Sequence, residues 1–410
     1  MVIKTETNEN SSNSAHNKNK GGRNQSGLRI HNERRILSII RKEEAISKAK
    51  ISTKAGLSAQ AVTVIIKGLE ADNLLLRKEA QKGSVGQPSV PFSLNPDGAF
   101  GIGLKVGRRS FDLTLIDFVG NVRATLHEFC DYPTVHGLLN FLNKGITALT
   151  LSLSNEYASR IKGMGIAIPH EIWGWAEEAG APIEALNEWK KFDFTERISD
   201  ICDLPIYICN DDTSACSAEL CFGNPGGFTN FLYVFIGTFI GGGVVINGSL
   251  LTGKTGNAGA IGSLPIPLLK KNGQIGTQQL ITKSSLFVLE KMLHEAGYNT
   301  EKIHNSYEYW GDYGDIIDLW IDQVAEGLAY AAISAAAIFE AESIVIDGTV
   351  PETVLGKIVD LTKDKIKSAD LRGLSALQCI SGTIGGKAQS VGSANLPLLA
   401  TYFQEIDLSS

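Results

Sequence analysis

The sequence lacks any long uninterrupted apolar run. No uncharged apolar stretch approaches the roughly 18 residues that a membrane-spanning helix needs. The first residues are rich in Asn, Ser and Lys and contain no apolar core of a signal peptide. We therefore expect a cytoplasmic protein that does not enter a membrane.

Paired cysteines are also lacking. The chain has six cysteines, and no two of them form a CxxC pair. This spacing supports neither a zinc knuckle nor a thioredoxin-type motif, so we expect reduced and mostly buried thiols. With 410 residues and 43% apolar content, the chain is long enough for two or three domains with their own cores.

The modest net charge of −6 conceals an uneven distribution. Residues 1–90 contain 16 Lys and Arg against 8 Asp and Glu, whereas the remainder contains 22 against 36. The basic end can attract a polyanion that the acidic body would repel. The asymmetry therefore places any nucleic-acid contact near the N-terminus.

Residues 1–28 are polar, poor in aromatic residues and repetitive in Asn and Ser. Such a segment cannot bury enough surface to offset the entropy of ordering, so we predict a disordered arm. Contact with DNA phosphates and simple solvation both remain open for it.

Residues 29–97 show the pattern of a winged helix-turn-helix domain. A first helix carries an apolar stripe at Ile36, Leu37, Ile39 and Ile40. A short helix from about Ser47 breaks at Gly56, and a second short helix opens at Ser58, which is a good N-cap. Two short strands then flank a glycine-containing segment that is typical of a wing.

The second short helix is the predicted reading element in the DNA major groove. Gln suits adenine, Thr suits the thymine methyl group, and Lys suits a phosphate or guanine. An alternative is that the module only docks another protein. The candidate DNA-contacting residues are Ser58, Gln60, Thr63 and Lys67 on the helix and Lys82, Gly86, Gln87 and Pro88 on the wing.

Residues 98–410 read as an α/β body, because apolar strands that end in glycine turns alternate with helices. The turns and strand ends occur, in order, in GIGLKVGRRS, GMGIAIPH, ICNDDTSA, FLYVFIGTFIGGGVVINGSLL and SIVIDGTV. A single glycine turn is weak evidence, whereas this order is much more specific.

These motifs resemble the ROK family of repressors and sugar kinases over roughly residues 30–405. The similar segments are the wing GSVGQPS, the strand end NDDTSACSAE and the long run IGTFIGGGVVINGSLLTGKTGNAGAIG. The resemblance implies an actin-like (ribonuclease H-like) ATPase-type body with a sugar cleft between two lobes. Lobe one would span about 98–209 plus the C-terminal helix, and lobe two about 210–392.

The first phosphate turn departs from the family's kinases. Those enzymes carry an Asp and then Gly-Gly-Thr, whereas this chain has Lys105 at the Asp position and Arg108 at the second Gly. A cation cannot hold Mg²⁺, and a side chain at Arg108 obstructs backbone approach to a phosphate. Although Asp211 stands at the position of the catalytic base, we expect no kinase activity, no catalytic residue and no cofactor.

The sugar loop departs as well. The family usually has a Glu and a His where this chain has Ala260 and Ser263, and no cysteine lies between Cys221 and Cys379. A structural zinc needs about four N or S ligands, so we predict no metal. The residues that match the family's cleft are His170, Asn187, Asn210, Asp211, Asn257 and Ser263.

The combination predicts a transcriptional regulator of carbohydrate metabolism, in the sense of a repressor. It would bind a double-stranded DNA operator as a homodimer or higher homo-oligomer and sense a sugar or sugar derivative. Two alternatives remain open: a ligand-independent DNA-binding protein with a degenerate cleft, and a sugar kinase with an accessory DNA-binding domain.

Overall fold

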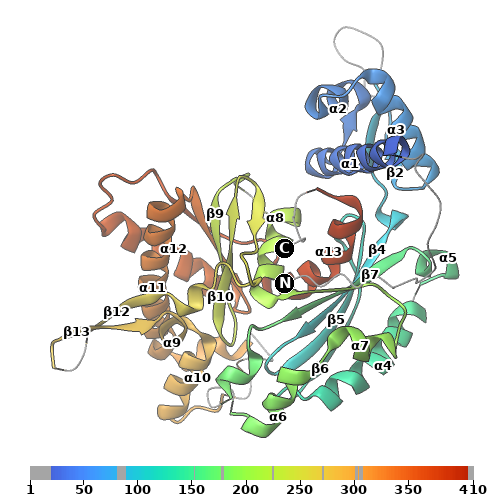
Figure 1. The fold of residues 1–410 in the computed structure, drawn as a ribbon. Helices are drawn as coiled ribbons and strands as arrows, with labels where there is room; N and C mark the ends of the chain where they lie inside the picture. The colour runs from blue at the N-terminus through green and yellow to red at the C-terminus, as the bar shows by residue number, and fades with distance from the viewer. Residues whose placement is uncertain are drawn as a thin grey trace.

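The computed structural model describes residues 20–80, 89–151, 153–176, 180–223, 226–269, 272–300, 303 and 308–404 (Figure 1). A small N-terminal module lies on a body of two lobes, each built around its own β-sheet (Figure 1). Within these residues, no helix combines the length and the apolar content that crossing a membrane requires.

The N-terminal module is a winged helix. Its described strands form one antiparallel sheet in the order β1-β3-β2, and Gly56 ends the second helix in the left-handed conformation with φ 59°. The winged helix-turn-helix prediction is confirmed. The elements are α1 (Lys20–Glu43), β1 (Ile46–Ser47), α2 (Lys48–Ala55), α3 (Ala59–Ala71), β2 (Leu75–Arg77) and β3 (Pro91–Leu94).

Helix α1 is longer than the sequence pattern predicted. Helix α1 begins at Lys20, inside the segment 1–28 that we predicted to be disordered, because the helix that carries the apolar stripe extends further towards the N-terminus. The tip of the predicted wing, with Lys82, Gly86, Gln87 and Pro88, lies outside the described residues.

Lobe one contains a sheet in the order β6-β5-β4-β7-β8. An antiparallel meander of β4, β5 and β6 is extended by β7 and β8, which run parallel to β4. The strands are β4 (Phe100–Val106), β5 (Ser110–Asp117), β6 (Val122–Phe129), β7 (Ile161–Ile168) and β8 (Ile206–Asn210). The helices of this part are α4 (Val135–Leu151), α5 (Asn155–Ala158), α6 (Ile183–Asn187) and α7 (Phe194–Ser199).

Lobe two repeats this arrangement in the order β11-β10-β9-β14-β15, again with a meander followed by parallel strands. A separate hairpin of β12 and β13 extends from this lobe (Figure 1). The strands are β9 (Phe231–Ile236), β10 (Ile240–Ile246), β11 (Ser249–Leu251), β12 (Pro265–Leu269), β13 (Ile275–Gln279), β14 (Ser343–Gly348) and β15 (Gln378–Ser381). The helices are α9 (Ile281–Ser284), α10 (Leu286–Glu295), α11 (Asp315–Phe339) and α12 (Glu352–Ser368).

Helices α8 (Asp211–Phe222) and α13 (Ala388–Tyr402) lie between the two sheets (Figure 1). Glycines on β7 and on α13 itself allow very close packing of this helix. A Cβ atom at Gly165 of β7 would lie 1.8 Å from the Ser393 carbonyl oxygen, and one at Gly392 would lie 1.9 Å from that of Ser214 in α8. Helix α13 is therefore held on one side by lobe one and on the other by α8.

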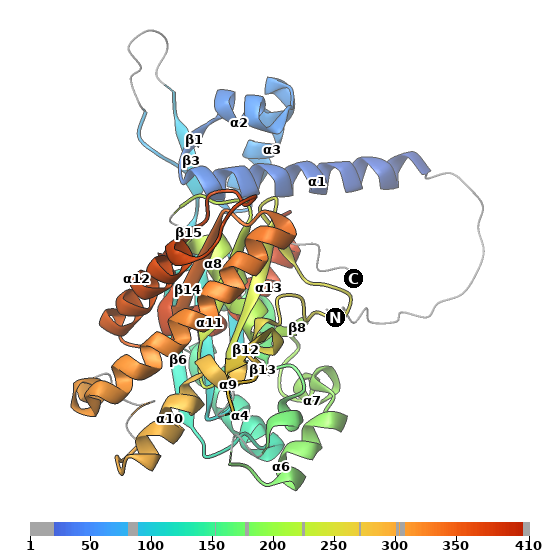
Figure 2. The ribbon, with the colours of Figure 1, turned by 90° about the vertical axis from the view of Figure 1, so that its left-hand side faces the viewer.

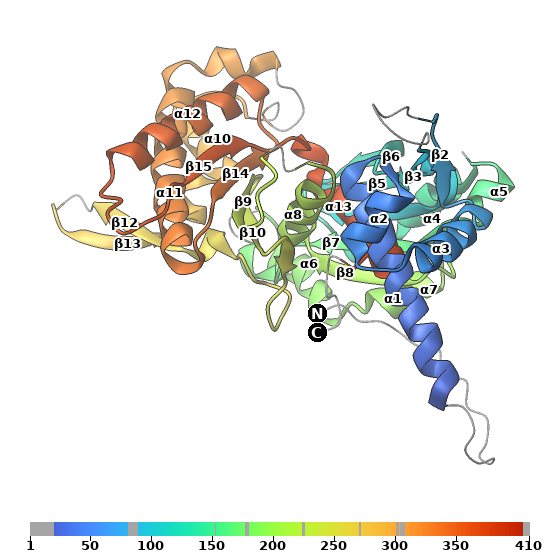
Figure 3. The ribbon, with the colours of Figure 1, turned by 90° about the horizontal axis from the view of Figure 1, so that it is seen from above.

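The far end of α13 supports the winged helix. Apolar side chains of α1, α2, α3, the tip of β5 and the C-terminal half of α13 form one continuous hydrophobic core. Arg34 of α1 adds hydrogen bonds from Nη2 to the Ala400 carbonyl oxygen (2.7 Å) and from Nε to that of Thr401 (3.2 Å). Helix α1 accordingly lies across the body above α13 (Figures 2 and 3).

Candidate functional site

A cavity of about 530 Å³ lies between the two lobes. Its walls come from the β4–β5 turn, the ends of β7 and β8, the β9–β10 turn, the segment before β12 and the start of α13. In α/β folds, ligands bind at the carboxyl ends of the strands. Several segments of this cavity wall lie at such strand ends. The position and mixed polar and apolar walls suit a small polar ligand.

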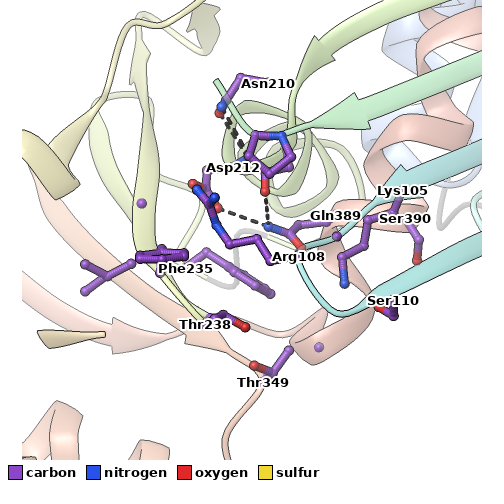
Figure 4. A pocket seen from close by; sticks show the side chains of 18 of the residues that line it. Lys105, Arg108, Ser110, Asn210, Asp212, Phe235, Thr238, Thr349, Gln389 and Ser390 are labelled. Atoms are coloured by element: carbon purple, nitrogen blue, oxygen red, sulfur yellow. Dashed lines mark hydrogen bonds between the residues drawn. The ribbon is translucent and has the colours of Figure 1, made fainter. Parts of the chain in front are cut away.

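Two adjacent aspartates begin α8 at the cavity wall. The Asn210 side-chain oxygen caps this helix by accepting hydrogen bonds from the backbone N–H groups of Asp212 (3.0 Å) and Thr213 (3.1 Å). From α13, Gln389 Nε2 donates to Asp211 Oδ2 at 3.2 Å and to Asp212 Oδ1 at 3.1 Å, as Figure 4 shows for Asp212. The amide fixes both carboxyl groups and joins α13 to α8.

The environment favours a proton on this pair of carboxyl groups. Burial raises the pKa of Asp211, although the cations of Arg108 and Lys105 oppose that rise. The pKa of Asp212 is raised well above its ordinary value by burial and by the adjacent Asp211 carboxylate. Burial and the adjacent charges therefore disfavour two full negative charges on this pair.

An ion-pair cluster lies beside the β4–β5 turn. Lys105 Nζ lies 3.3 Å from Asp112 Oδ2, and His127 Nδ1 lies 2.5 Å from Asp112 Oδ1. Burial alone would raise the pKa of Asp112, but Lys105 and His127 together lower it to about 2. Lys105 is thus engaged with a neighbouring strand of lobe one.

Two arginines of the β4–β5 turn, Arg108 and Arg109, reach across the cavity to lobe two. The Arg108 guanidinium stacks over the Phe239 ring, with its carbon 3.9 Å from the ring centre. Arg109 Nη2 lies 3.8 Å from Glu290 Oε2 on α10. These contacts join the β4–β5 turn to the β9–β10 turn and to α10, so this turn connects the lobes.

The structure brings together most of the predicted ligand-binding residues. His170, Asn210, Asp211, Asn257 and Ser263 all line the cavity. The exception is Asn187, which ends α6 and does not belong to the cavity wall.

The position of Asn187 has a local explanation. Its neighbours Leu186 and Trp189 are buried in the core of lobe one, and the Trp189 indole donates to the Pro133 carbonyl oxygen. This packing fixes α6 by its core-facing side chains and leaves Asn187 outside the cleft.

Residues of the site that sequence reasoning missed include Asp112, Phe239 and Gln389. The signal for Asp112 was its place opposite Lys105 in the β4–β5 hairpin, since the register pairs these two positions. No local pattern indicated Gln389, which is 178 residues away from Asp211 in the chain.

Asp347 lies at the carboxyl end of β14 and is held by a network of hydrogen bonds. Its Oδ1 accepts from the Gly348 N–H (2.8 Å), and its Oδ2 accepts from the Gly385 N–H (3.0 Å) and the Tyr233 hydroxyl (3.1 Å). The side chain is fully buried. Asp347 therefore accepts hydrogen bonds from backbone groups of its own turn and of the segment before α13.

Helix α3 begins as predicted. The Ser58 hydroxyl oxygen accepts a hydrogen bond from the Ala61 N–H at 3.2 Å. Gln60 and Lys67 are exposed, whereas Thr63 is half-buried and donates its hydroxyl proton to the Ala59 carbonyl oxygen at 2.8 Å. Among the residues that the structure describes, no group of three or more His, Cys, Asp or Glu side chains could hold a metal ion.

Comparisons with known proteins agree with both parts of the chain. Residues 31–75 match the winged helix-turn-helix DNA-binding family, and residues 101–396 match the ROK family. The xylose repressor of Bacillus spizizenii is 26% identical over 292 residues, which cover 70% of this chain and 71% of that protein. The xylose repressor of Bacillus subtilis is 25% identical over 239 residues, 57% of this chain and 60% of that protein.

Solved structures show the same fold. A ROK family transcriptional regulator, a homolog of the E. coli MLC protein, has a TM-score of 0.63 at 20% identity and covers 91% of this chain and 96% of its own. A ROK family glucokinase from Streptomyces griseus, in complex with glucose and AMPPNP, has a TM-score of 0.54 at 17% identity over 73% of this chain and 99% of its own. Because the family match extends over most of its length, this chain belongs to the ROK family.

Proposed function

We propose that this protein is a transcriptional repressor that binds operator DNA through its winged helix and senses a sugar or sugar derivative in the cleft between its lobes. The observation that carries the proposal is the α13 connection. Helix α13 carries Gln389 at the cleft. At its other end, under the winged helix, its backbone carbonyl groups accept hydrogen bonds from Arg34. The similarity to proteins named xylose repressors supports a sugar as the ligand and repression as the mode of regulation.

The cleft is suited to a polyhydroxylated ligand. Asn210, Asp211 and Asn257 contribute amide and carboxyl groups to the cavity wall. Ala260 leaves this wall without the glutamate that the family resemblance implies, so the ligand need not be glucose. A ligand that bonds Asp211 competes with Gln389 and shifts the balance between two positions of α13.

Catalysis is not part of the proposed function. The position that resemblance assigns to a metal-orienting carboxylate holds Lys105, which is already paired with Asp112. The Arg108 guanidinium of the β4–β5 turn stacks over the Phe239 ring of the β9–β10 turn. ATP consumption in the presence of any hexose would contradict this part of the proposal.

A homodimer is the expected assembly. Operators of helix-turn-helix proteins are inverted repeats because the protein has twofold symmetry. A change in the position of α13 would alter the spacing of two winged helices, and a fixed half-site spacing would no longer fit. Sedimentation with and without operator DNA measures the assembly.

The test is fluorescence anisotropy with a labelled duplex from upstream of the protein's own reading frame, followed by titration with a panel that includes xylose, glucose and their phosphates. We expect specific binding that one compound releases. Binding that no compound changes, together with a thermal-shift scan without response, would favour the ligand-independent alternative. Absence of binding would contradict the DNA-binding role.

A further inference from the structure

Val64 is an unusual residue on the recognition helix. Its side chain is 62% exposed, although the other large apolar residues of α3 are buried. Helical spacing places Val64 one turn after Gln60 and one turn before Lys67, so it lies at the centre of the exposed face. Single exposed apolar residues are common, and its position among groove-facing residues is what needs explanation.

The neighbouring Thr63, which we predicted to suit a thymine methyl group, is less exposed than Val64. Thr63 is half-buried and its hydroxyl proton is donated to the Ala59 carbonyl oxygen within the helix. It therefore cannot donate that proton to a base edge. The middle of the exposed face of α3 thus offers methyl groups, with polar side chains at both ends.

The thymine C5-methyl group is the apolar feature of the major groove. On the strength of these observations, and resting on the DNA-binding function proposed above, we propose that Val64 is a specificity-determining residue that contacts a thymine methyl group in the operator. Gln60, one turn away, suits an adenine. The operator then carries a required thymine close to the adenine read by Gln60.

A protein partner is the competing explanation for an exposed valine. The charge of the region favours DNA, because residues 1–90 carry twice as many basic as acidic side chains. Arg29, Arg35 and Lys67 are exposed cations of the same module. DNA, a polyanion with methyl groups in its major groove, accounts for both the basic charge of the module and the exposed Val64. An apolar protein surface accounts only for the exposed Val64.

The experiment removes the methyl group from each side of the contact. The full-length protein selects duplexes from a random library, and each conserved thymine is then replaced by uracil, which lacks only the methyl group. We expect one uracil substitution to weaken binding by about fourfold, the value of one buried carbon unit. The Val64→Ala variant should bind the thymine duplex with the same loss and show no further loss with uracil.

The controls separate this contact from general effects. Val122→Ala removes the same atoms from an exposed valine of β6 in the body and should leave both affinities unchanged. Val64→Ile keeps an apolar tip and should retain sensitivity to uracil. Because Val64 is exposed, circular dichroism should show a folded Val64→Ala variant.

Three outcomes would count against the inference. Equal uracil losses in wild type and Val64→Ala, or no uracil effect at any position, would show that Val64 does not read the methyl group. A changed sedimentation coefficient with unchanged DNA affinity would assign Val64 to a protein contact. Failure to select any duplex would instead contradict the proposed DNA-binding function itself.

Discussion

At the scale of single residues, Asp112 shows how buried charges are paired beside the β4–β5 turn. Lys105 and His127 lower the pKa of this mostly buried carboxyl group to about 2, from an ordinary value of 3.8. A carboxyl group with a depressed pKa stabilises the folded state above pH 3.8, and this contribution disappears as the pH falls through 2. The cluster thus stabilises the turn at neutral pH.

We expect Asp112→Asn to lower the free energy of unfolding by about 2 kcal/mol at pH 7, because the carboxylate that pairs with Lys105 and His127 is lost. Urea denaturation at pH 7 and at decreasing pH measures the difference, which should shrink towards pH 2. The exposed Asp203→Asn is the matched control. A difference that stays constant with pH would show that Asp112 acts through packing alone.

The cleft could be predicted residue by residue only where motifs mark it. Asn210, Asp211, Asn257 and Ser263 follow from the resemblance of their motifs to the ROK family, and the structure brings them together. Gln389 could not be predicted, because its role depends on α13 returning from the end of the chain to α8. Asn187 was misplaced because its position depends on how α6 packs, which its own residue type does not determine.

At the scale of elements, helix α3 depends on its cap. The Ser58 hydroxyl accepts the Ala61 N–H, which otherwise has no partner in the first turn. Ser58 is also a predicted DNA-contacting residue, and its two roles can be separated. An Asp at this position keeps the cap but places a negative charge near DNA phosphates.

We expect Ser58→Ala to reduce stability by about 1 kcal/mol because the cap is lost, whereas Ser58→Asp should retain stability and bind DNA more weakly. Thermal unfolding measures the first effect and anisotropy with the selected duplex measures the second. Ser58→Asp with wild-type DNA affinity would place Ser58 away from the phosphates.

Strands could be predicted from the sequence where glycine turns or polar strand ends follow them. Gly165 illustrates the limit of this reading: its place in a strand was visible, but its need to lack a side chain arises from α13, more than 200 residues later. The early start of α1 at Lys20 was missed because polar residues give no apolar stripe. Long-range packing decides both features.

We expect Gly165→Ala to destabilise the protein by about 3 kcal/mol or more, since the new Cβ would overlap the Ser393 carbonyl oxygen and displace α13. Gly356→Ala is the control, because it lies inside helix α12 with no atom within 4 Å of a Cβ and should stabilise slightly. Similar melting temperatures for the two variants would contradict the close packing of α13.

At the scale of the whole molecule, α13 is the direct connection between cleft and winged helix. Its 15 residues span about 22 Å, with Gln389 at the cleft end and Tyr402 near the DNA-binding module. The winged helix shares its hydrophobic core with this helix. A rigid helix held between α8 and lobe one can transmit a displacement at one end to the other, if both ends remain attached.

Arg34 is the attachment that can be removed with least damage to the core. We expect Arg34→Ala to retain DNA binding, because α3 is untouched, but to lose most of the response to the sugar that releases wild-type protein, because α1 no longer bonds the Ala400 and Thr401 carbonyl groups. Anisotropy with and without that sugar measures the response.

Arg35→Ala removes the same charge from the neighbouring exposed position and should change only the salt dependence of DNA binding. An unchanged sugar response in Arg34→Ala would show that the displacement reaches the winged helix by the shared apolar core rather than by this pair of hydrogen bonds.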